Sequence, residues 1–154
     1  MYSITQSQVS FESGGKDIRV DCFLPGVPSK SNGAQASTPG ETPSLQRFPA
    51  VIALHGSGGG HASMAAPASL LAEQGFAVYV LHYFDRTGTT EIDGLQTIFR
   101  HFPVWMKTLW DAVSFVARQP QVDKQRIGLL GFSLGAYLAL SAAARVFGDE
   151  PDCV

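Results

Sequence analysis

A five-residue stretch near the end of the printed sequence has the residue types of a nucleophile turn. Gly131-Phe132-Ser133-Leu134-Gly135 matches the pattern Gly-x-Ser-x-Gly. In a nucleophile elbow, the serine occupies a strained turn between a strand and a helix, and its hydroxyl is exposed above the sheet. Small residues are needed two positions to either side, because the strand and the helix approach each other closely there. We predict that Ser133 is a catalytic nucleophile; the alternative is a serine that only caps the following helix.

A second stretch could supply the other half of acyl-transfer chemistry. His55-Gly56-Ser57-Gly58-Gly59-Gly60 follows an apolar run at 50–54. Acyl transfer needs fixed N–H donors directed at the developing oxyanion. In the elbow architecture one donor belongs to the residue after the nucleophile, here Leu134, and the other to a loop after an earlier strand. Ser57 or Gly58 is the predicted second donor. A phosphate cradle is the alternative, but the stretch matches neither common phosphate-binding glycine pattern, because a histidine follows its last glycine.

The elements that must position these residues alternate between strands and helices. Continuous apolar runs predict buried strands at 50–54, 76–81 and 127–130. Apolar residues at helical spacing predict helices over 63–74, near 103–119 and over 134–146. This order indicates an α/β fold, in which a mostly parallel sheet carries flanking helices and the chain stops after the nucleophile-elbow helix.

The first 46 residues differ in character from this region. Residues 7–12 and 17–24 alternate apolar and polar side chains around a Ser-Gly-Gly-Lys turn, which predicts a hairpin with Ile18, Val20, Cys22 and Leu24 on one face. The Pro-, Gly- and Ser-rich composition of 25–46 predicts a long mobile loop. We therefore interpret the chain as part of a single domain, divided into a hairpin (1–24), a loop (25–46), βα units (47–146) and a tail (147–154).

The bulk composition excludes several classes of function. The 154 residues are 45% hydrophobic and 16% charged, with a formal net charge of −2, as in a folded globular protein. No run of like charge favours binding to nucleic acid or to an anionic membrane. No secretion signal is recognised, and no apolar run approaches the ~20 residues of a membrane span. Cys22 and Cys153 lack metal-ligand or redox spacing, so we expect reduced thiols in a cytoplasmic protein without metal or other cofactor.

Together, these stretches resemble the dienelactone hydrolase family of the α/β hydrolases. The resemblance runs from about Asp17 to Val146, apart from the loop, and is carried by AVIALHGSGGG, QGFAVYVLHYFDRTGTT, the helix segment with Asp111, and QPQVDKQRIGLLGFSLGAYLAL. It implies an eight-stranded, mostly parallel sheet and a nucleophile–acid–histidine triad that acts on esters or lactones of small carboxylic acids.

The resemblance also carries implications for single residues. It gives Ser133 the place of the family nucleophile, and it gives Arg86 the place of an arginine that holds the substrate carboxylate. A solvated loop arginine is the alternative for Arg86. Gly56 stands where the name-giving enzymes carry a glutamate, so dienelactone itself is not the expected substrate.

The triad partners of Ser133 are not found by sequence order. In this fold the acid and then the histidine follow the nucleophile, but all four histidines precede it: His55, His61, His82 and His101. We therefore expect the chain to be the N-terminal part of a hydrolase, inactive or weakly active alone. His55 is the one histidine that we weigh as a substitute base or a substrate contact, because its strand is expected beside that of Ser133.

The predicted function is hydrolysis of a small-molecule carboxylic ester or lactone through an acyl-Ser133 intermediate. One alternative is a non-catalytic remnant that forms a homodimer through the open sheet edge at strand 127–130. Another is a peptidase or an acyltransferase on the same fold.

Overall fold

The sheet is built from a parallel core and an antiparallel hairpin. The computed structural model describes residues 1–26, 46–92 and 94–145. The strands are β1 (Ile4–Ser13), β2 (Lys16–Pro25), β3 (Phe48–Leu54), β4 (Ala77–Leu81) and β5 (Val122–Gly131). Their order is β1-β2-β4-β3-β5. Strands β4, β3 and β5 are parallel, whereas β2 runs antiparallel to β4 and to β1. The described residues thus contribute five strands, where the family resemblance implies eight.

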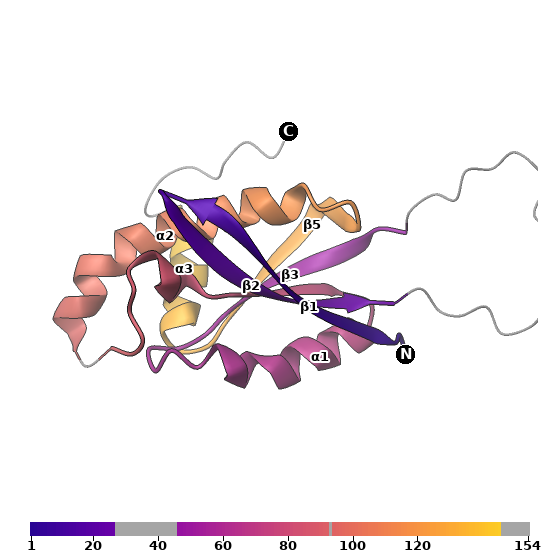
Figure 1. Ribbon diagram of the computed structural model, residues 1–154, viewed down its shortest axis with the longest axis horizontal. Coiled ribbons are helices and arrows are strands. Elements are labelled where there is room, and N and C mark those ends of the chain that lie inside the picture. The colour runs from indigo at the N-terminus through magenta and orange to yellow at the C-terminus, as the bar shows by residue number, and fades with distance from the viewer. Residues whose placement is uncertain (27–45, 93, 146–154) are drawn as a thin grey trace, which may run out of the picture.

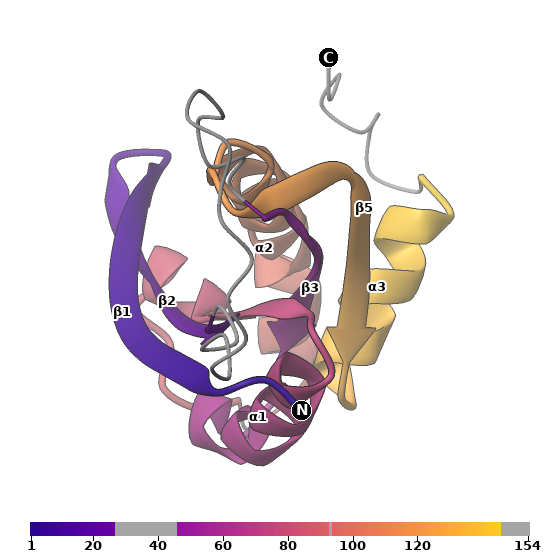
Figure 2. The same cartoon turned by 90° about the vertical axis from the view of Figure 1, so that its right-hand side faces the viewer.

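Helices cover both faces of this sheet (Figures 1 and 2). They are α1 (Ala65–Glu73), α2 (Leu95–Ala117) and α3 (Leu134–Ala143), with short 3-10 turns η1 (His61–Met64) and η2 (Tyr83–Arg86). Helix α1 packs on one face through Ala68 and Ala72, whereas α2 and α3 share the core of the other face, centred on Trp105 and Leu109. The predicted α/β class is confirmed. None of the helices in the described ranges combines the length and the apolar character that crossing a membrane requires.

The hairpin forms because its turn residues accept positive φ. Gly14 and Gly15 have φ of 50° and 77°, the two left-handed positions of a two-residue turn that matches the twist of the flanking strands. The predicted hairpin is confirmed, and the predicted inward face is buried at Ile18, Val20 and Cys22. Burial raises the pKa of the Cys22 thiol to about 11, so this cysteine is a packing residue and not a reactive one.

The predicted strands and helices are present, with one large boundary error. Helix α2 begins at Leu95, not near residue 103, and Pro103 lies inside it. A proline removes one helical hydrogen bond, which favours the interpretation of Pro103 as a helix start. The preceding turns nevertheless stay helical, because Ile98 and Phe102 pack against the core. The predicted loop 25–46 and tail 147–154 lie almost entirely outside the described residues.

The junction between β5 and α3 brings backbone segments into close contact. A Cβ atom on Gly135 would lie 2.2 Å from the carbonyl oxygen of Leu54 on β3. A Cβ atom on Gly131 would lie 2.2 Å from the carbonyl oxygen of Gly135 itself. Both contacts are with backbone, which cannot rotate away as a side chain can. The two outer glycines of the Gly-x-Ser-x-Gly stretch are therefore required by packing.

This packing makes a stability prediction. Gly135→Ala is expected to lower the free energy of unfolding by about 3 kcal/mol or more, because its methyl group overlaps backbone of β3. Urea denaturation followed by circular dichroism measures the change. Gly58→Ala is the matched control, since no heavy atom lies within 4 Å of the added carbon. Equal stability of the two variants would contradict the close-approach interpretation.

Candidate active site

Ser133 occupies a strained and exposed turn. Its φ of 52° and ψ of −117° are unusual for a residue with a side chain. Its side chain makes no capping hydrogen bond, although it sits at the N-cap of α3. Helix capping, the alternative weighed from sequence, therefore does not account for the hydroxyl. Strain at a position where nothing is capped is the geometry expected of a nucleophile elbow.

The glycine-rich loop lies directly against this turn. A Cβ atom on Gly56 would be 3.3 Å from the Cβ atom of Ser133. Phe132 N–H donates to the Leu54 carbonyl at 3.0 Å, which continues the pairing of β5 with β3 up to the elbow. Parallel pairing of β3 with β5, as the sequence analysis expected, thus brings the two glycine-containing stretches together.

A neighbouring segment holds the loop in place. Ile92 N–H donates to the Ser57 carbonyl at 3.0 Å. Gly59 has φ of 65°, and a side chain there would collide with the Thr90 carbonyl. The loop conformation is therefore set by the 90–92 segment as well as by the loop's own glycines.

The N–H groups of the three predicted oxyanion donors have no acceptor among the described residues. In the described part of the chain, the amides of Ser57, Gly58 and Leu134 donate to no protein group. Leu134 begins α3, so its N–H lies at the positive end of the helix dipole. Ser57 and Leu134 line the same groove as Ser133, whereas Gly58 is not among the lining residues. The geometry brings together Ser57, Ser133 and Leu134, and their roles as oxyanion donors and nucleophile remain predictions.

The groove beside Ser133 is apolar. It has a volume of about 460 Å³ and lies between α2 and α3. Its lining residues are Ser57, Leu95, Ile98, Phe99, Phe102, Pro103, Ser133, Leu134, Tyr137 and Ser141. Phe99 and Tyr137 are about three-quarters and two-thirds exposed, respectively. Sequence analysis missed this groove, because the helix predicted near 103–119 did not include residues 95–102.

His55 is buried, and its contacts point to structural support. Its Nδ1 lies 2.8 Å from the Gly56 carbonyl, and its ring stacks on Tyr83 at a centroid distance of 4.3 Å. Burial lowers the pKa of this imidazole, which favours the neutral form that donates to the carbonyl. With 1% of the residue exposed, His55 shapes the glycine loop from beneath and presents no surface to a substrate.

Arg86 is engaged by the hairpin turn. Its guanidinium donates to the carbonyls of Ser13 and Gly14. The group that the family resemblance would direct at a substrate carboxylate therefore satisfies backbone oxygens in this structure. The absence of a side chain on Gly14 leaves the space that the guanidinium fills.

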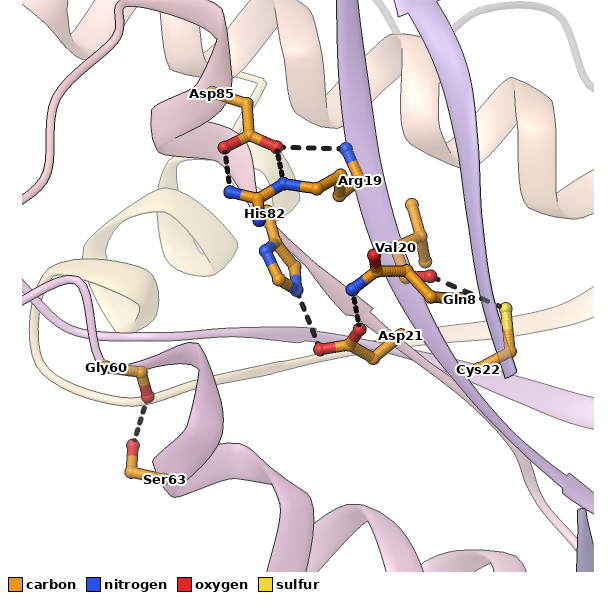
Figure 3. Close-up of polar contacts among 9 residues, drawn as sticks. All are labelled: Gln8, Arg19, Val20, Asp21, Cys22, Gly60, Ser63, His82 and Asp85. Atoms are coloured by element: carbon orange, nitrogen blue, oxygen red, sulfur yellow. Dashed lines mark hydrogen bonds and ion pairs between the residues drawn. The ribbon is translucent and has the colours of Figure 1, made fainter. Parts of the chain in front are cut away.

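The structure brings together a polar cluster that the sequence analysis did not find. Asp21 on β2, His61 at the start of η1 and His82 after β4 each offer a donor atom, and these atoms lie within 4.8 Å of one another. Figure 3 shows the His82 ring directed at Asp21, with an Nε2–Oδ2 distance of 2.7 Å. The antiparallel pairing of β2 with β4 brings Asp21 close to His82. No local sequence signal predicts that pairing.

Burial and hydrogen bonding shift the pKa of His82, and likewise that of Asp21, in opposite directions. Burial lowers the pKa of His82, and the neighbouring Asp21 only partly offsets that effect. Burial acts to raise the pKa of Asp21, but the hydrogen bonds from Gln8 and His82 hold it below its ordinary value. The two pKa shifts favour a neutral imidazole beside an ionised carboxylate.

A second polar pair flanks the cluster. Arg19 binds Asp85 through both guanidinium and backbone N–H groups, with a shortest distance of 2.8 Å (Figure 3). Burial acts to raise the pKa of Asp85, but these hydrogen bonds keep it below its ordinary value. This ion pair connects η2 to β2, and the two charges compensate each other.

No base is in place beside the predicted nucleophile. Within the described ranges, no histidine or carboxylate hydrogen-bonds the Ser133 hydroxyl. The fourth histidine, His101, lies on α2 with its ring 5.6 Å from that of Trp105. The acidic residues of the tail, Asp149, Glu150 and Asp152, lie outside the described residues.

Known proteins resemble this chain in both sequence and fold. It is 39% identical over 102 residues to acyl-coenzyme A thioesterase 6 of Mus musculus, a match that covers 66% of this chain and 22% of the relative. It is 34% identical over 106 residues to acyl-coenzyme A thioesterase 1 of Homo sapiens, again covering 66% and 22%. Bile acid-CoA:amino acid N-acyltransferase of Mus musculus is 36% identical over 115 residues, 75% of this chain and 24% of the relative. The chain thus spans less than a quarter of the length of these relatives.

Solved structures show the same fold at lower identity. A dienelactone hydrolase-like promiscuous phosphotriesterase from metagenomic libraries matches with a TM-score of 0.66 and 19% identity, covering 94% of this chain and 56% of that one. Dienelactone hydrolase from Anabaena variabilis matches with a TM-score of 0.62 and 23% identity, covering 93% and 59%.

The chain also matches the dienelactone hydrolase family as a whole. The match covers residues 37–150, which include the glycine-rich loop, the elbow and α3. The structure places these same parts in the arrangement that the fold requires, with parallel strands β3 and β5 leading to one edge. The chain belongs to the dienelactone hydrolase family.

Proposed function

We propose that this chain carries the nucleophile, the oxyanion donors and the acyl groove of a hydrolase that cleaves carboxylic esters or thioesters through an acyl-Ser133 intermediate. The single observation that carries the proposal is the strained, exposed Ser133 beside a groove that also contains two N–H groups without protein acceptors. The sequence analysis predicted esters and lactones. The acyl-coenzyme A thioesterases among the relatives extend this class to thioesters.

The first step forms a bond between Ser133 Oγ and the acyl carbon. Negative charge then develops on the former carbonyl oxygen, where the N–H groups of Leu134 and Ser57 are proposed to bind it. The position of Leu134 at the N-terminus of α3 adds the helix dipole to that stabilisation. Collapse of the intermediate expels the alcohol or thiol and leaves the acyl-serine, which water hydrolyses in the second step.

The proton of Ser133 requires a base that the described residues do not place beside it. We propose that the base is a histidine other than the four of the printed sequence and that a carboxylate orients it, in the chain order of this fold. His55 does not suit the role, since its Nδ1 is engaged by Gly56 and its ring is buried. The isolated chain is therefore proposed to bind and orient an acyl group better than it turns substrate over.

The apolar groove suits the acyl part of the substrate. Leu95, Ile98 and Phe99 from α2 face Tyr137 from α3 across it. Burying a hydrocarbon chain there is favourable by about 0.8 kcal/mol for each methylene group removed from water. We propose that the acyl chain extends from Ser133 into this groove and that the leaving group points away from it.

Acyl transfer to an amine is the second candidate. It is favoured by one relative, the bile acid-CoA:amino acid N-acyltransferase, which is 36% identical over 115 residues. The acyl-Ser133 step is common to both reactions, and only the acceptor differs. Formation of an amide product when an amino acid is added would select this candidate over hydrolysis.

The oxyanion arrangement can be tested without the base. A Ser133→Cys variant carries a nucleophile that ionises by itself, assisted by the N-terminus of α3. We expect p-nitrophenyl acetate to release one nitrophenolate per chain in a rapid burst, about 100-fold faster than for Ser141→Cys. Ser141 lines the same groove but lies within α3, away from the elbow.

Mass spectrometry of the acylated chain completes this test. The added acetyl group is expected on residue 133, and both variants should carry Cys153→Ser so that the tail thiol does not react. Buried Cys22, with its raised pKa, contributes little. Equal burst rates for the two variants would refute the proposed function.

The groove makes a prediction about chain length. In the Ser133→Cys variant, p-nitrophenyl octanoate is expected to react faster than the acetate, and Phe99→Ala should reduce this preference about three- to tenfold. Leu140→Ala is the matched control, because Leu140 is also exposed but does not line the groove. If Phe99→Ala kept the full preference for octanoate over acetate, the acyl chain would not bind in this groove.

A separate proposal concerns the edge of the sheet. In the described part of the chain, β5 pairs only with β3, and its residues Ile127, Leu129 and Leu130 are half-buried. An apolar strand edge is a template for pairing with a second strand, so we propose that two copies of this chain pair through β5. Sedimentation velocity over a range of concentrations is expected to show a dimer that Leu129→Lys converts to monomer. A wild-type chain that stays monomeric at 100 times the lowest concentration would reject this dimer.

A further inference from the structure

The cluster of Asp21, His61 and His82 is separate from the groove of Ser133, since none of the three residues lines that groove. His82 follows the carboxyl end of β4, and Asp21 comes from the neighbouring strand β2. His61 begins η1, immediately after the loop, and its N–H donates to the Gly59 carbonyl at 2.9 Å. Three segments far apart in the sequence therefore converge on one small polar site.

His82 is held in this site with one nitrogen unsatisfied. Its side chain is 3% exposed, and its Nε2 lies 2.7 Å from Asp21 Oδ2. Its Nδ1 is buried without a hydrogen-bond partner in the described part of the chain. The His61 ring packs on it with centroids 3.9 Å apart. An ion shared with Asp21 would bind His82 through Nε2, and the proton of the neutral ring would then stand on Nδ1, which no other group engages in the described part of the chain.

The second carboxylate oxygen of Asp21 is already engaged. Gln8 Nε2 donates to Asp21 Oδ1 at 2.6 Å (Figure 3). This contact orients the carboxylate and directs Oδ2 at the histidines. Outer hydrogen bonds of this kind fix the ligands of metal sites and are nearly as important as the ligands themselves.

The donor set matches the requirements of a borderline transition metal ion. Two imidazoles and one carboxylate are typical zinc ligands, and three protein ligands leave a fourth position for water. Ligand atoms around tetrahedral zinc lie about 3.3 Å apart, given bonds of about 2.0 Å. The donor atoms lie within 4.8 Å of one another, so binding would require them to approach by at most about 1.5 Å, and the His82–Asp21 hydrogen bond would be exchanged for two bonds to the ion. The nearby Arg19 guanidinium is paired with Asp85, which offsets its repulsion of a cation.

We propose that Asp21, His61 and His82 bind a divalent transition metal ion of the zinc class. This proposal departs from the sequence analysis, which expected no metal because it considered only cysteine spacing. The bound ion would connect the glycine-rich loop to strands β2 and β4. It would thereby hold the loop whose Gly56 lies against Ser133, as a positioning element and not as a participant in acyl transfer.

Direct binding measurements test this proposal independently of any enzymatic activity. Isothermal titration of the tag-free chain with Zn²⁺ is expected to show one site per chain. Co²⁺ should give the visible absorption bands of a four-coordinate ion with nitrogen and oxygen ligands. His61→Ala and Asp21→Asn should each weaken Zn²⁺ binding at least tenfold, since each removes one of three ligands.

Matched controls separate this site from adventitious binding. His101→Ala removes a histidine that belongs to another contact, with Trp105, and should retain wild-type affinity. Cys153→Ser removes the tail thiol and should also have no effect. His61 is only partly buried, so far-UV circular dichroism should show that His61→Ala keeps its fold. Absence of a one-to-one Zn²⁺ isotherm, or full affinity in both His61→Ala and Asp21→Asn, would overturn the proposal, as would loss of binding in Cys153→Ser.

Discussion

The close approach of α3 to the sheet is the constraint on which the candidate active site depends. The backbone of the elbow lies within contact distance of β3, and only glycine fits at positions 131 and 135. The chain must then reverse between these glycines, which forces Ser133 into a positive φ. The same reversal exposes the serine hydroxyl and leaves the Leu134 N–H at the start of a helix. Packing between backbone segments thus determines the position of both the predicted nucleophile and one predicted oxyanion donor.

The glycine-rich loop is the element shared by the two proposed sites of this molecule. On one side, Gly56 contacts Ser133, and Ser57 lines the apolar groove. On the other side, His55 supports the loop through its bond to Gly56 and its stacking on Tyr83. The Tyr83 hydroxyl in turn donates to the His55 carbonyl at 2.7 Å. The contacts of His55 and Tyr83 with the loop therefore limit its conformations. For this reason we expect a change at the Asp21, His61 and His82 cluster to alter the position of the loop beside the elbow.

Part of this arrangement could be predicted because its signals are local. The Gly-x-Ser-x-Gly turn, the Gly-Gly hairpin turn and the apolar runs of β3, β4 and β5 each reflect the conformational limits of a few consecutive residues. The predicted start of α2 was wrong, because Pro103 locally favours a helix boundary. In the folded chain, the packing of Ile98 and Phe102 against the core maintains the helix before this proline. The groove beside Ser133 was missed for the same reason. Arg86 illustrates a different limit: its residue type suits anion binding, but its partners are two backbone carbonyls of a turn 72 residues away.

By itself, the sequence determined the α/β class, the hairpin, the strand–turn–helix unit around Ser133 and the family resemblance. These features depend on backbone preferences and on the burial of short apolar runs, both of which are written in neighbouring residues. Only the tertiary structure decided that α2 and α3 form an apolar groove, that His55 is a support, and that Asp21, His61 and His82 meet. Each of these results depends on which strands pair and on how helices cross the sheet. Such contacts join residues distant in the chain, and a single sequence carries no local signal for them.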